Sequence, residues 1–334
     1  MIKRLLLGAG ALLLVLAAAA AFVCLPKFTS RADSYVCLPA SSPTDSLYAQ
    51  LDTLSSGFRP KAFRMLAKAA RLKSVPAGRY RVDGLSTLSL LRKLRNGQQD
   101  PMRYNIPVVW TPEQLAARLA RAFSSDSAQF AATFHDTALC RELGFEPTEI
   151  FCHIPADTYE FYWTTKPQDF LKRMAKENTK YWNDERKAKA EKAGLTPTEV
   201  VTLASIVERE TANNAEKPTI AGLYLNRIKR GMKLQADPTV KFAVGDFALR
   251  RIRHSHLMTP SPYNTYKVEG LPPGPISLPS KQSIEAVLNY KPSDYLFMCA
   301  KEDFSGTHNF AATGAEHAKN ARKYIDALNA RGIK

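Results

Sequence analysis

The chain begins with an uninterrupted apolar segment. Residues 5–25 carry no charge, follow Lys3 and Arg4, and end at Pro26. At about 1.5 Å per residue a helix of this length reaches ~31 Å, close to the hydrocarbon thickness of a bilayer. The pattern therefore predicts a helix that can span a membrane once.

The residues at both ends of this segment indicate whether it is cleaved or retained and how it is oriented in the membrane. A cleaved signal peptide is the alternative to a retained anchor, because the alanine run ending at Ala21 supplies small residues. The apolar run continues through residues 22–25, which favours retention. The two basic residues before the span favour a cytoplasmic tip, although Lys27 just beyond it weakens the charge asymmetry. Under either alternative the rest of the chain is exported.

Past the anchor, strand and helix periodicities alternate. Residues 27–60 are mixed in composition, and we interpret them as a linker leading into a helix. Alternation over residues 75–82 predicts a strand, and leucines at helical spacing predict a helix over residues 86–95, ending on Asn96-Gly97. Residues 104–110 predict a further strand. Together these elements indicate a small α+β module.

The remaining two thirds of the chain is richer in helix. Thr111 caps a helix that has Pro112 at its first position and Gln114 three residues after the cap. The helical pattern is interrupted at residues 154–159 and resumes over residues 167–182. These patterns predict a larger, mixed α/β domain.

The predicted fold class is therefore α+β, in three parts. Residues 1–26 form a cytoplasmic tip and transmembrane anchor. Residues 27–110 form the linker and small module, and residues 111–334 form the larger domain.

A further helix begins at Thr196, which serves as N-cap, with Pro197 at the first helical position and Glu199 able to close a capping box. Four of its apolar residues recur at the spacing that forms one buried stripe: Val200, Leu203, Ile206 and Val207. Glu210 continues this stripe at the next turn. A carboxylate thus ends an apolar face.

Helical geometry separates Glu210 from its neighbour Glu208. Two residues correspond to about 200° around a helix, so the two carboxylates cannot both point into one cleft. Burial beside apolar side chains raises a carboxyl pKa, which lets such a group act as an acid near neutral pH. The alternative is structural, since a glutamate late in an amphipathic helix often pairs with an arginine or marks the edge of the face.

Charge and cysteine content narrow the classes of function. The net charge of +16 suits nucleic acid, anionic lipid or an acidic polymer. Export argues against nucleic acid, and no recognition motif for it occurs. The sequence contains no CxxC pair, and His254-Ser255-His256 has no carboxylate cluster around it. We therefore predict no metal and no cofactor.

The segment around residues 204–211, which contains E-R-E-T, resembles the MltG (YceG-like) endolytic murein transglycosylases. Further blocks match that family in order: Leu225 to Arg227, Gly231 to Gln235, Asp237 to Val240, Thr259 to Tyr266, Gly270 to Ile276, and Gly306 to Phe310. Weaker similarity extends the resemblance over roughly residues 60–330. Its small N-terminal module is LysM-like in this family, but residues 70–105 depart from the family's sequence, so glycan binding is not carried over to them.

The resemblance implies a peptidoglycan lytic transglycosylase, a lyase that cuts the β-1,4 bond after N-acetylmuramic acid within glycan strands and leaves 1,6-anhydro ends. It implies that Glu210 is catalytic, in agreement with the stripe argument. It also implies a single-pass protein of the inner membrane, whose catalytic domain lies on the periplasmic side. Glycan strands are the expected substrate, and peptidoglycan synthases are candidate partners.

Polar side chains in the matching blocks are the candidates for binding sugar hydroxyls and N-acetyl groups: Gln235, Asp237, Tyr263, Asn264, Thr265, Tyr266 and His308. Several lie in loop-like sequence, where Asp and Asn also cap turns. Their alternative role is therefore local turn structure, and for His308 it is a satisfied position in the core.

Two other functions remain open. A non-catalytic scaffold that binds the cell wall predicts that Glu210 is dispensable. A hydrolytic muramidase needs a second carboxylate, for which Asp237 and Glu208 are candidates, and predicts reducing ends.

Overall fold

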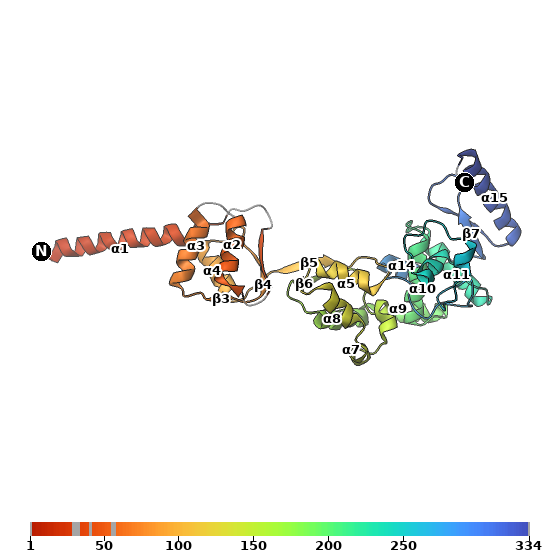
Figure 1. Cartoon of the computed structure of the whole chain (residues 1–334), viewed down its shortest axis with the longest axis horizontal. Coiled ribbons are helices and arrows are strands. Elements are labelled where there is room, and N and C mark those ends of the chain that lie inside the picture. The colour runs from red at the N-terminus through yellow and green to blue at the C-terminus, as the bar shows by residue number, and fades with distance from the viewer. Residues whose placement is uncertain (1, 29–33, 40–41, 55–57, 333–334) are drawn as a thin grey trace. The chain divides into compact units, whose positions relative to one another are not determined.

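The computed structural model describes residues 2–28, 34–39, 42–54 and 58–332. The contacts divide the chain into two compact units (Figure 1). Unit 1 comprises residues 1–104, 122–125 and 160–166, and unit 2 comprises residues 105–121, 126–159 and 167–334. Helices and short antiparallel strands occur in both, so the predicted mixed α+β class is confirmed.

Unit 1 contains four helices and five short strands among its described residues. In chain order they are α1 (Ile2–Cys24), β1 (Tyr35–Leu38), β2 (Ser42–Pro43), α2 (Thr44–Leu54), α3 (Phe58–Ala69), β3 (Ser74–Val75), β4 (Gly78–Arg81), α4 (Thr87–Arg95) and β5 (Pro101–Asn105). Strand β1 pairs with β4, and β2 pairs with β3, both antiparallel.

The apolar helix is α1. Its window Leu7–Cys24 has a mean hydropathy of 2.5 and is 0% buried inside the protein. Within the described residues α1 is the one helix long and apolar enough to cross a membrane, and a signal sequence would pass the same test. The predicted apolar helix is thus present, consistent with a single-pass anchor.

The interpretation of residues 27–60 as a linker is wrong for the part that the structure describes. Four of these residues are fully buried in the core of unit 1: Val36, Leu38, Leu47 and Leu51. They are buried because β1 pairs with β4 and α2 packs on β1 and β2. Mixed composition concealed these elements because they are short and each buries only one face.

Two strand predictions need correction as well. The predicted strand over residues 75–82 is divided into β3 and β4, with Pro76-Ala77 between them, because proline lacks the N–H that a continuous ladder needs. The strand predicted over residues 104–110 is instead β5, which ends at Asn105 and pairs with β6 (Thr158–Tyr162). The helix expected over residues 86–95 is confirmed as α4, capped by Ser86.

Unit 2 is mainly helical, and strand β6 is divided between the units, with Thr158 and Tyr159 in unit 2 and its other residues in unit 1. Apart from β6, its described elements are α5 (Pro112–Ala120), α6 (Ser127–Phe134), α7 (Thr137–Glu142), the 3-10 helix η1 (Pro147–Cys152), α8 (Pro167–Tyr181), α9 (Asp184–Ala193), α10 (Pro197–Glu210), α11 (Lys217–Lys229), α12 (Asp237–Val244), α13 (His254–Leu257), α14 (Lys281–Leu288), β7 (Phe297–Ala300), β8 (His308–Ala311) and α15 (Gly314–Ala330).

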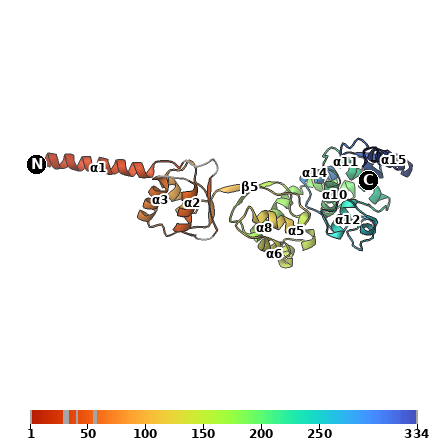
Figure 2. The same ribbon diagram turned by 45° about the horizontal axis from the view of Figure 1, so that its top comes forward.

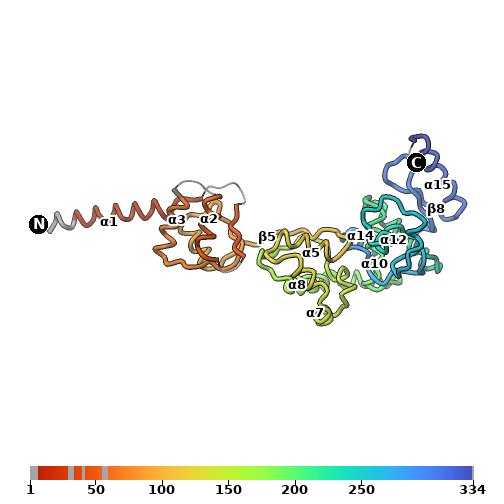
Figure 3. The backbone as a smooth tube through the Cα atoms, in the orientation of Figure 1, coloured from red at the N-terminus to blue at the C-terminus, as the bar shows by residue number. Residues whose placement is uncertain are grey.

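Helix α10 is the centre of unit 2. It packs against α11, α12 and α14, and these helices surround it in Figure 2. Every residue from Val200 to Val207 is buried. Strands β7 and β8 pair antiparallel and are covered by α15 at the C-terminal end (Figure 3). A buried central helix gives the residues at its end a fixed position.

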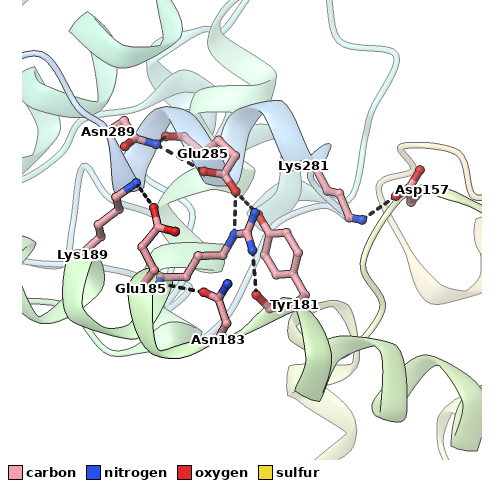
Figure 4. Close-up of polar contacts among 9 residues, drawn as sticks. Asp157, Tyr181, Asn183, Glu185, Lys189, Lys281, Glu285 and Asn289 are labelled. Carbon is pink, nitrogen blue, oxygen red and sulfur yellow. Dashed lines mark hydrogen bonds and ion pairs between the residues drawn. The ribbon is translucent and has the colours of Figure 1, made fainter.

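Polar contacts fasten α9 and α8 to α14 (Figure 4). Arg186 Nε and Tyr181 OH both donate to Glu285 Oε1, at 2.7 and 3.0 Å. Lys281 at the start of α14 also forms an ion pair with Asp157. The charged helix α9 therefore contributes one arginine to the packing of α14.

Candidate active site

The start of α10 follows its sequence signals. Thr196 accepts a hydrogen bond from the Glu199 N–H, and the Glu199 side chain accepts one from the Thr196 N–H, which confirms the predicted capping box. The helix continues to Glu210 and ends with Thr211 in extended conformation. Glu210 is therefore the last residue of a rigid, buried helix.

Glu210 lies in the wall of a cavity of about 240 Å³. Its Oε1 accepts a hydrogen bond of 2.6 Å from the Tyr224 hydroxyl of α11. The cavity is lined by Glu210, Leu223, Tyr224, Arg227, Leu234, Gln235, Asp237, Tyr266, Met298, Cys299, Ala300 and His308. The helix end, α11, the start of α12 and the β7–β8 pair thus all contribute.

The environment of Glu210 favours its protonated form. Burial raises the pKa of Glu210 to about 7, and the negative charge of Asp237 acts in the same direction. The hydrogen bond from Tyr224 and the charge of Arg227 act against that rise. Burial also raises the pKa of Tyr224 well above its usual value, so the phenol remains a donor. The carboxyl can both give and take a proton near neutral pH.

Glu208 points elsewhere and is held by the protein. Its Oε2 accepts hydrogen bonds from the Ser280 backbone N–H at 3.0 Å and from the Ser283 hydroxyl at 2.6 Å. Lys217 Nζ lies 3.3 Å from the same oxygen, with only 4% of its side chain exposed. Burial opposes ionisation of Glu208, yet these hydrogen bonds and the lysine charge prevail and lower its pKa. Glu208 does not line the cavity.

Arg209, between the two glutamates, pairs with neither. Its guanidinium carbon lies 4.0 Å from the centroid of the Trp110 ring, and burial lowers its pKa to about 10. Within the described parts of the chain Glu210 has one hydrogen bond, from Tyr224, and no ion pair. The alternative that Glu210 is a structural partner of an arginine finds no support in these contacts.

The segment before α12 is held in place by Arg227. This arginine donates to the backbone oxygens of Lys233 and Leu234, at 3.1 and 2.8 Å, and to Gln235 Oε1 at 3.3 Å. Gln235 has a positive φ of 50°, a conformation that costs free energy in a residue other than glycine. Asp237 accepts a 2.7 Å hydrogen bond from the Tyr266 hydroxyl. Arg227 thereby keeps Gln235 at the cavity, and Tyr266 holds Asp237 there.

Four of the seven predicted binding residues line the cavity with Glu210: Gln235, Asp237, Tyr266 and His308. The other three do not. Asn264 is fully buried and donates to the backbone oxygens of Leu257 and Thr259. Thr265 is also fully buried and bonds Thr239 at 2.8 Å. These two side chains shape the loop that presents Tyr266.

Tyr263 is half-buried and packs on Phe242, with ring centroids 4.7 Å apart. Sequence could not separate it from Tyr266, because both tyrosines lie in the same polar, loop-like block. In the structure the Tyr263 ring packs on α12, whereas the Tyr266 ring lines the cavity.

His308 has a partner that the sequence did not indicate. Glu216 accepts a hydrogen bond from the His308 backbone N–H at 2.8 Å, and its second oxygen lies 3.2 Å from His308 Nδ1. This carboxylate follows Glu210 by six residues and fixes the imidazole at the cavity rim. Tyr224, Arg227 and Glu216 are the site residues that sequence reasoning missed. Tyr224 and Arg227 are three residues apart and therefore lie on the same side of α11, and this spacing was the one sequence signal for the two of them.

The described residues contain no group of three or more His, Cys, Asp or Glu side chains able to hold a metal ion. Around the cavity, the Glu210 carboxyl, whose pKa is raised to about 7, is accompanied by hydroxyl, amide and imidazole groups.

Comparison with known proteins identifies the family of this chain. The family model described as YceG-like matches residues 36–323. This chain belongs to the YceG-like family. The resemblance found in the sequence is thereby confirmed.

Relatives within the family give the extent of the similarity. The chain is 31% identical over 287 residues to a Bacillus subtilis protein named endolytic murein transglycosylase, covering 80% of this chain and 78% of that one. A Streptococcus pneumoniae protein of the same name is 34% identical over 137 residues, which is 40% of this chain and 25% of that one. The crystal structure of a YceG-like protein from Listeria monocytogenes superposes with a TM-score of 0.59 at 26% identity, covering 86% of this chain and 98% of that one.

Proposed function

We propose that this protein is an endolytic murein transglycosylase in which Glu210 alone performs the acid–base chemistry. The supporting observation is the contrast between two carboxylates on one helical turn. Glu210 faces a cavity with its pKa raised to about 7, whereas Glu208 is bound by serines and a lysine. A relative that aligns over 80% of this chain carries that enzyme name.

In the proposed reaction the Glu210 carboxyl acts twice, first as a proton donor and then as a proton acceptor. The carboxyl first protonates the glycosidic oxygen between N-acetylmuramic acid and N-acetylglucosamine as the bond from C1 to that oxygen breaks. The resulting carboxylate then accepts the proton of the C6 hydroxyl as the C6 oxygen bonds to C1. The products are a free 4-hydroxyl and a 1,6-anhydro end, and Glu210 regains its proton. Intramolecular attack has a large proximity advantage, so no bound water is needed.

The residues around the cavity have separate proposed roles. Gln235, Asp237, Tyr266 and His308 bind the sugar hydroxyls and N-acetyl groups. Tyr224 positions Glu210, because its hydroxyl donates directly to the reacting carboxyl. Asn264 and Thr265, predicted as binding residues, act through the loop they hold, and Tyr263 packs behind it on α12.

The decisive experiment is the chemistry of the new ends. Purified glycan strands digested in ¹⁸O water should yield anhydro ends that carry no label and are lighter by one water than hydrolytic products. A hydrolase places a solvent oxygen on C1 whether it activates water directly or forms a glycosyl-enzyme. Labelled reducing ends as the main product would refute the transglycosylase.

A muramidase is the second candidate, because Asp237 lines the same cavity as Glu210. The Tyr266 hydroxyl donates a hydrogen bond of 2.7 Å to its carboxylate. The non-catalytic scaffold is the third candidate, and it predicts that Glu210 can be replaced without loss of function.

We further propose that α1 is a single-pass anchor in the inner membrane and that the catalytic part, residues 111–334, lies on the periplasmic side. Residues 27–110 would be the LysM-like module, and peptidoglycan synthases would be partners at sites of strand elongation. N-terminal sequencing of the membrane fraction tests the anchor. A mature terminus near residue 22 would overturn it.

A further inference from the structure

The exposed face of α3 is strongly basic. Residues 58–82 contain eight arginines and lysines and no aspartate or glutamate. Lys61, Arg64 and Lys68 recur at three- and four-residue spacing, and all three are exposed. This spacing places them on one side of the helix. The face defined by these three residues and Met65 is called the α3 face below.

An apolar side chain lies in the middle of these charges. Met65 is 63% exposed, although methionine is usually buried. The opposite side of α3 is fixed in the core by Phe63 and Ala67, which are fully buried. The α3 face therefore cannot rotate inward to hide Met65.

Few of the positive charges on the α3 face are neutralised by ion pairs. Arg64 pairs with Asp52, and that contact is exposed to solvent, where such pairs contribute little. Lys61 and Lys68 form no ion pair within the described residues, and neither do Arg71 and Lys73, which follow the helix. The face retains a net positive charge available to an outside partner.

The position of α3 within unit 1 indicates that partner. Helix α3 packs against α1, the helix that can enter a membrane. At the end of α1, Phe22 and Leu25 remain 64% and 66% exposed. A basic helix beside the end of a membrane span lies at the depth of the lipid headgroups.

We propose that the α3 face binds anionic phospholipid headgroups of the membrane that α1 enters, with Met65 inserted at the boundary between headgroups and acyl chains. Basic side chains around an apolar residue are the composition of helices that lie in this interface. The inference depends on a retained α1 but not on the proposed catalytic activity. It assigns unit 1 a role in holding the protein against the membrane surface.

Oxidation of Met65 tests the proposal on the full chain. The protein is inserted in nanodiscs of phosphatidylcholine alone or of phosphatidylcholine mixed with phosphatidylglycerol, treated briefly with hydrogen peroxide, and analysed by peptide mass spectrometry. Met258, which is 53% exposed in unit 2, is the internal reference. Each basic residue near an anionic surface strengthens binding about fivefold. We expect the oxidation rate of Met65 to be at least about fivefold lower in the anionic discs than in the neutral discs, and that of Met258 to be the same in both. High salt should abolish the protection of Met65.

A pair of charge-reversal variants supplies the matched control. Lys61→Glu with Lys68→Glu should abolish the protection of Met65. Lys187→Glu with Lys192→Glu changes net charge equally on exposed positions of α9 and should preserve it. Cleavage of soluble glycan strands should be unchanged in both variants.

Three results would overturn the proposal. The first is equal oxidation of Met65 in the two lipid compositions. The second is protection that survives the Lys61→Glu, Lys68→Glu pair. The third is protection in neutral discs that appears only when glycan strands are added, because the α3 face would then bind glycan rather than lipid.

Discussion

The two sides of the last turn of α10 carry the same side chain in opposite environments. On one side Glu208 receives hydrogen bonds from Ser280 and Ser283 and the charge of Lys217, and its pKa is lowered. On the other side Glu210 receives one hydrogen bond, and its pKa is raised to about 7. Both glutamates are partly buried. The difference teaches that the number and charge of partners, rather than burial alone, decides which glutamate can carry a proton at neutral pH.

The sharpest way to test this comparison is Glu210→Gln. The substitution retains shape and removes the titrating proton, so we expect cleavage of glycan strands to fall by about 10²–10⁴-fold, the usual contribution of a general acid–base group. Release of anhydro-muramyl products from purified strands measures the loss, and circular dichroism checks the fold. Glu208→Gln, assayed as folded protein, should stay within a few-fold of wild type. Activity of Glu210→Gln at the wild-type rate would contradict the assignment.

The raised pKa also gives stability a defined pH dependence. Between the unfolded pKa of about 4.5 and the folded pKa of about 7, native Glu210 holds a proton that the unfolded chain releases. Its contribution to stability is therefore present at low pH and lost as pH rises through this window, by about 2–3 kcal/mol. The unfolding free energy of wild type minus that of Glu210→Gln should decline by this amount between pH 4.5 and 7. A difference that is flat with pH would show that Glu210 titrates normally.

Glu208→Gln should show the opposite dependence. The pKa of Glu208 is lowered, so its stabilisation is present above the unfolded pKa and is lost as pH falls through the folded value. At neutral pH the variant leaves Lys217 buried without its counter-charge, and we expect a cost of about 2 kcal/mol in denaturant unfolding. The cost should shrink in acid. A variant as stable as wild type at pH 7 would mean that the serine and lysine contacts contribute nothing.

Tyr224→Phe tests the single hydrogen bond that Glu210 accepts. The Tyr224 hydroxyl favours the ionised carboxylate, so its removal should raise the pKa of Glu210 further. We expect the pH profile of cleavage to move to higher pH. Because the carboxyl also loses the hydrogen bond that positions it, we expect the maximal rate to fall about tenfold, equivalent to about 1.4 kcal/mol. A rate loss with an unmoved profile would indicate that Tyr224 acts only through packing.

The smallest expected effect belongs to Asp237→Asn, and it separates the candidate reactions. The charge of Asp237 contributes to the raised pKa of Glu210, so its removal should move the pH profile slightly to lower pH. We expect the rate of a transglycosylase to change only a few-fold. Complete loss of cleavage in this variant, together with labelled reducing ends from the wild-type enzyme, would favour a muramidase that uses Asp237 as its second carboxylate.

Sequence reasoning was most accurate where the physics is local. Helical periodicity placed Glu210 on the buried stripe and directed Glu208 away from it, and the contacts of both agree with that geometry. The capping box of Thr196 and Glu199 is confirmed, as is the span of α1 as an apolar helix. Where elements are short and bury one face, as between residues 27 and 60, the pattern was too weak and a linker was wrongly expected.

The sequence by itself determined the family, the apolar helix α1, and the face of α10 from which Glu210 projects, because a span, a cap and a 3.6-residue period involve neighbours in the chain. Only the tertiary structure decided the partners. Ser280 reaches Glu208 from 72 positions away, and Glu216 meets His308 across 92. It also separated Tyr266 at the cavity from Asn264 and Thr265 behind it. A pKa and a binding surface arise from the groups that folding brings together, and the order of residues along the chain does not contain those distances.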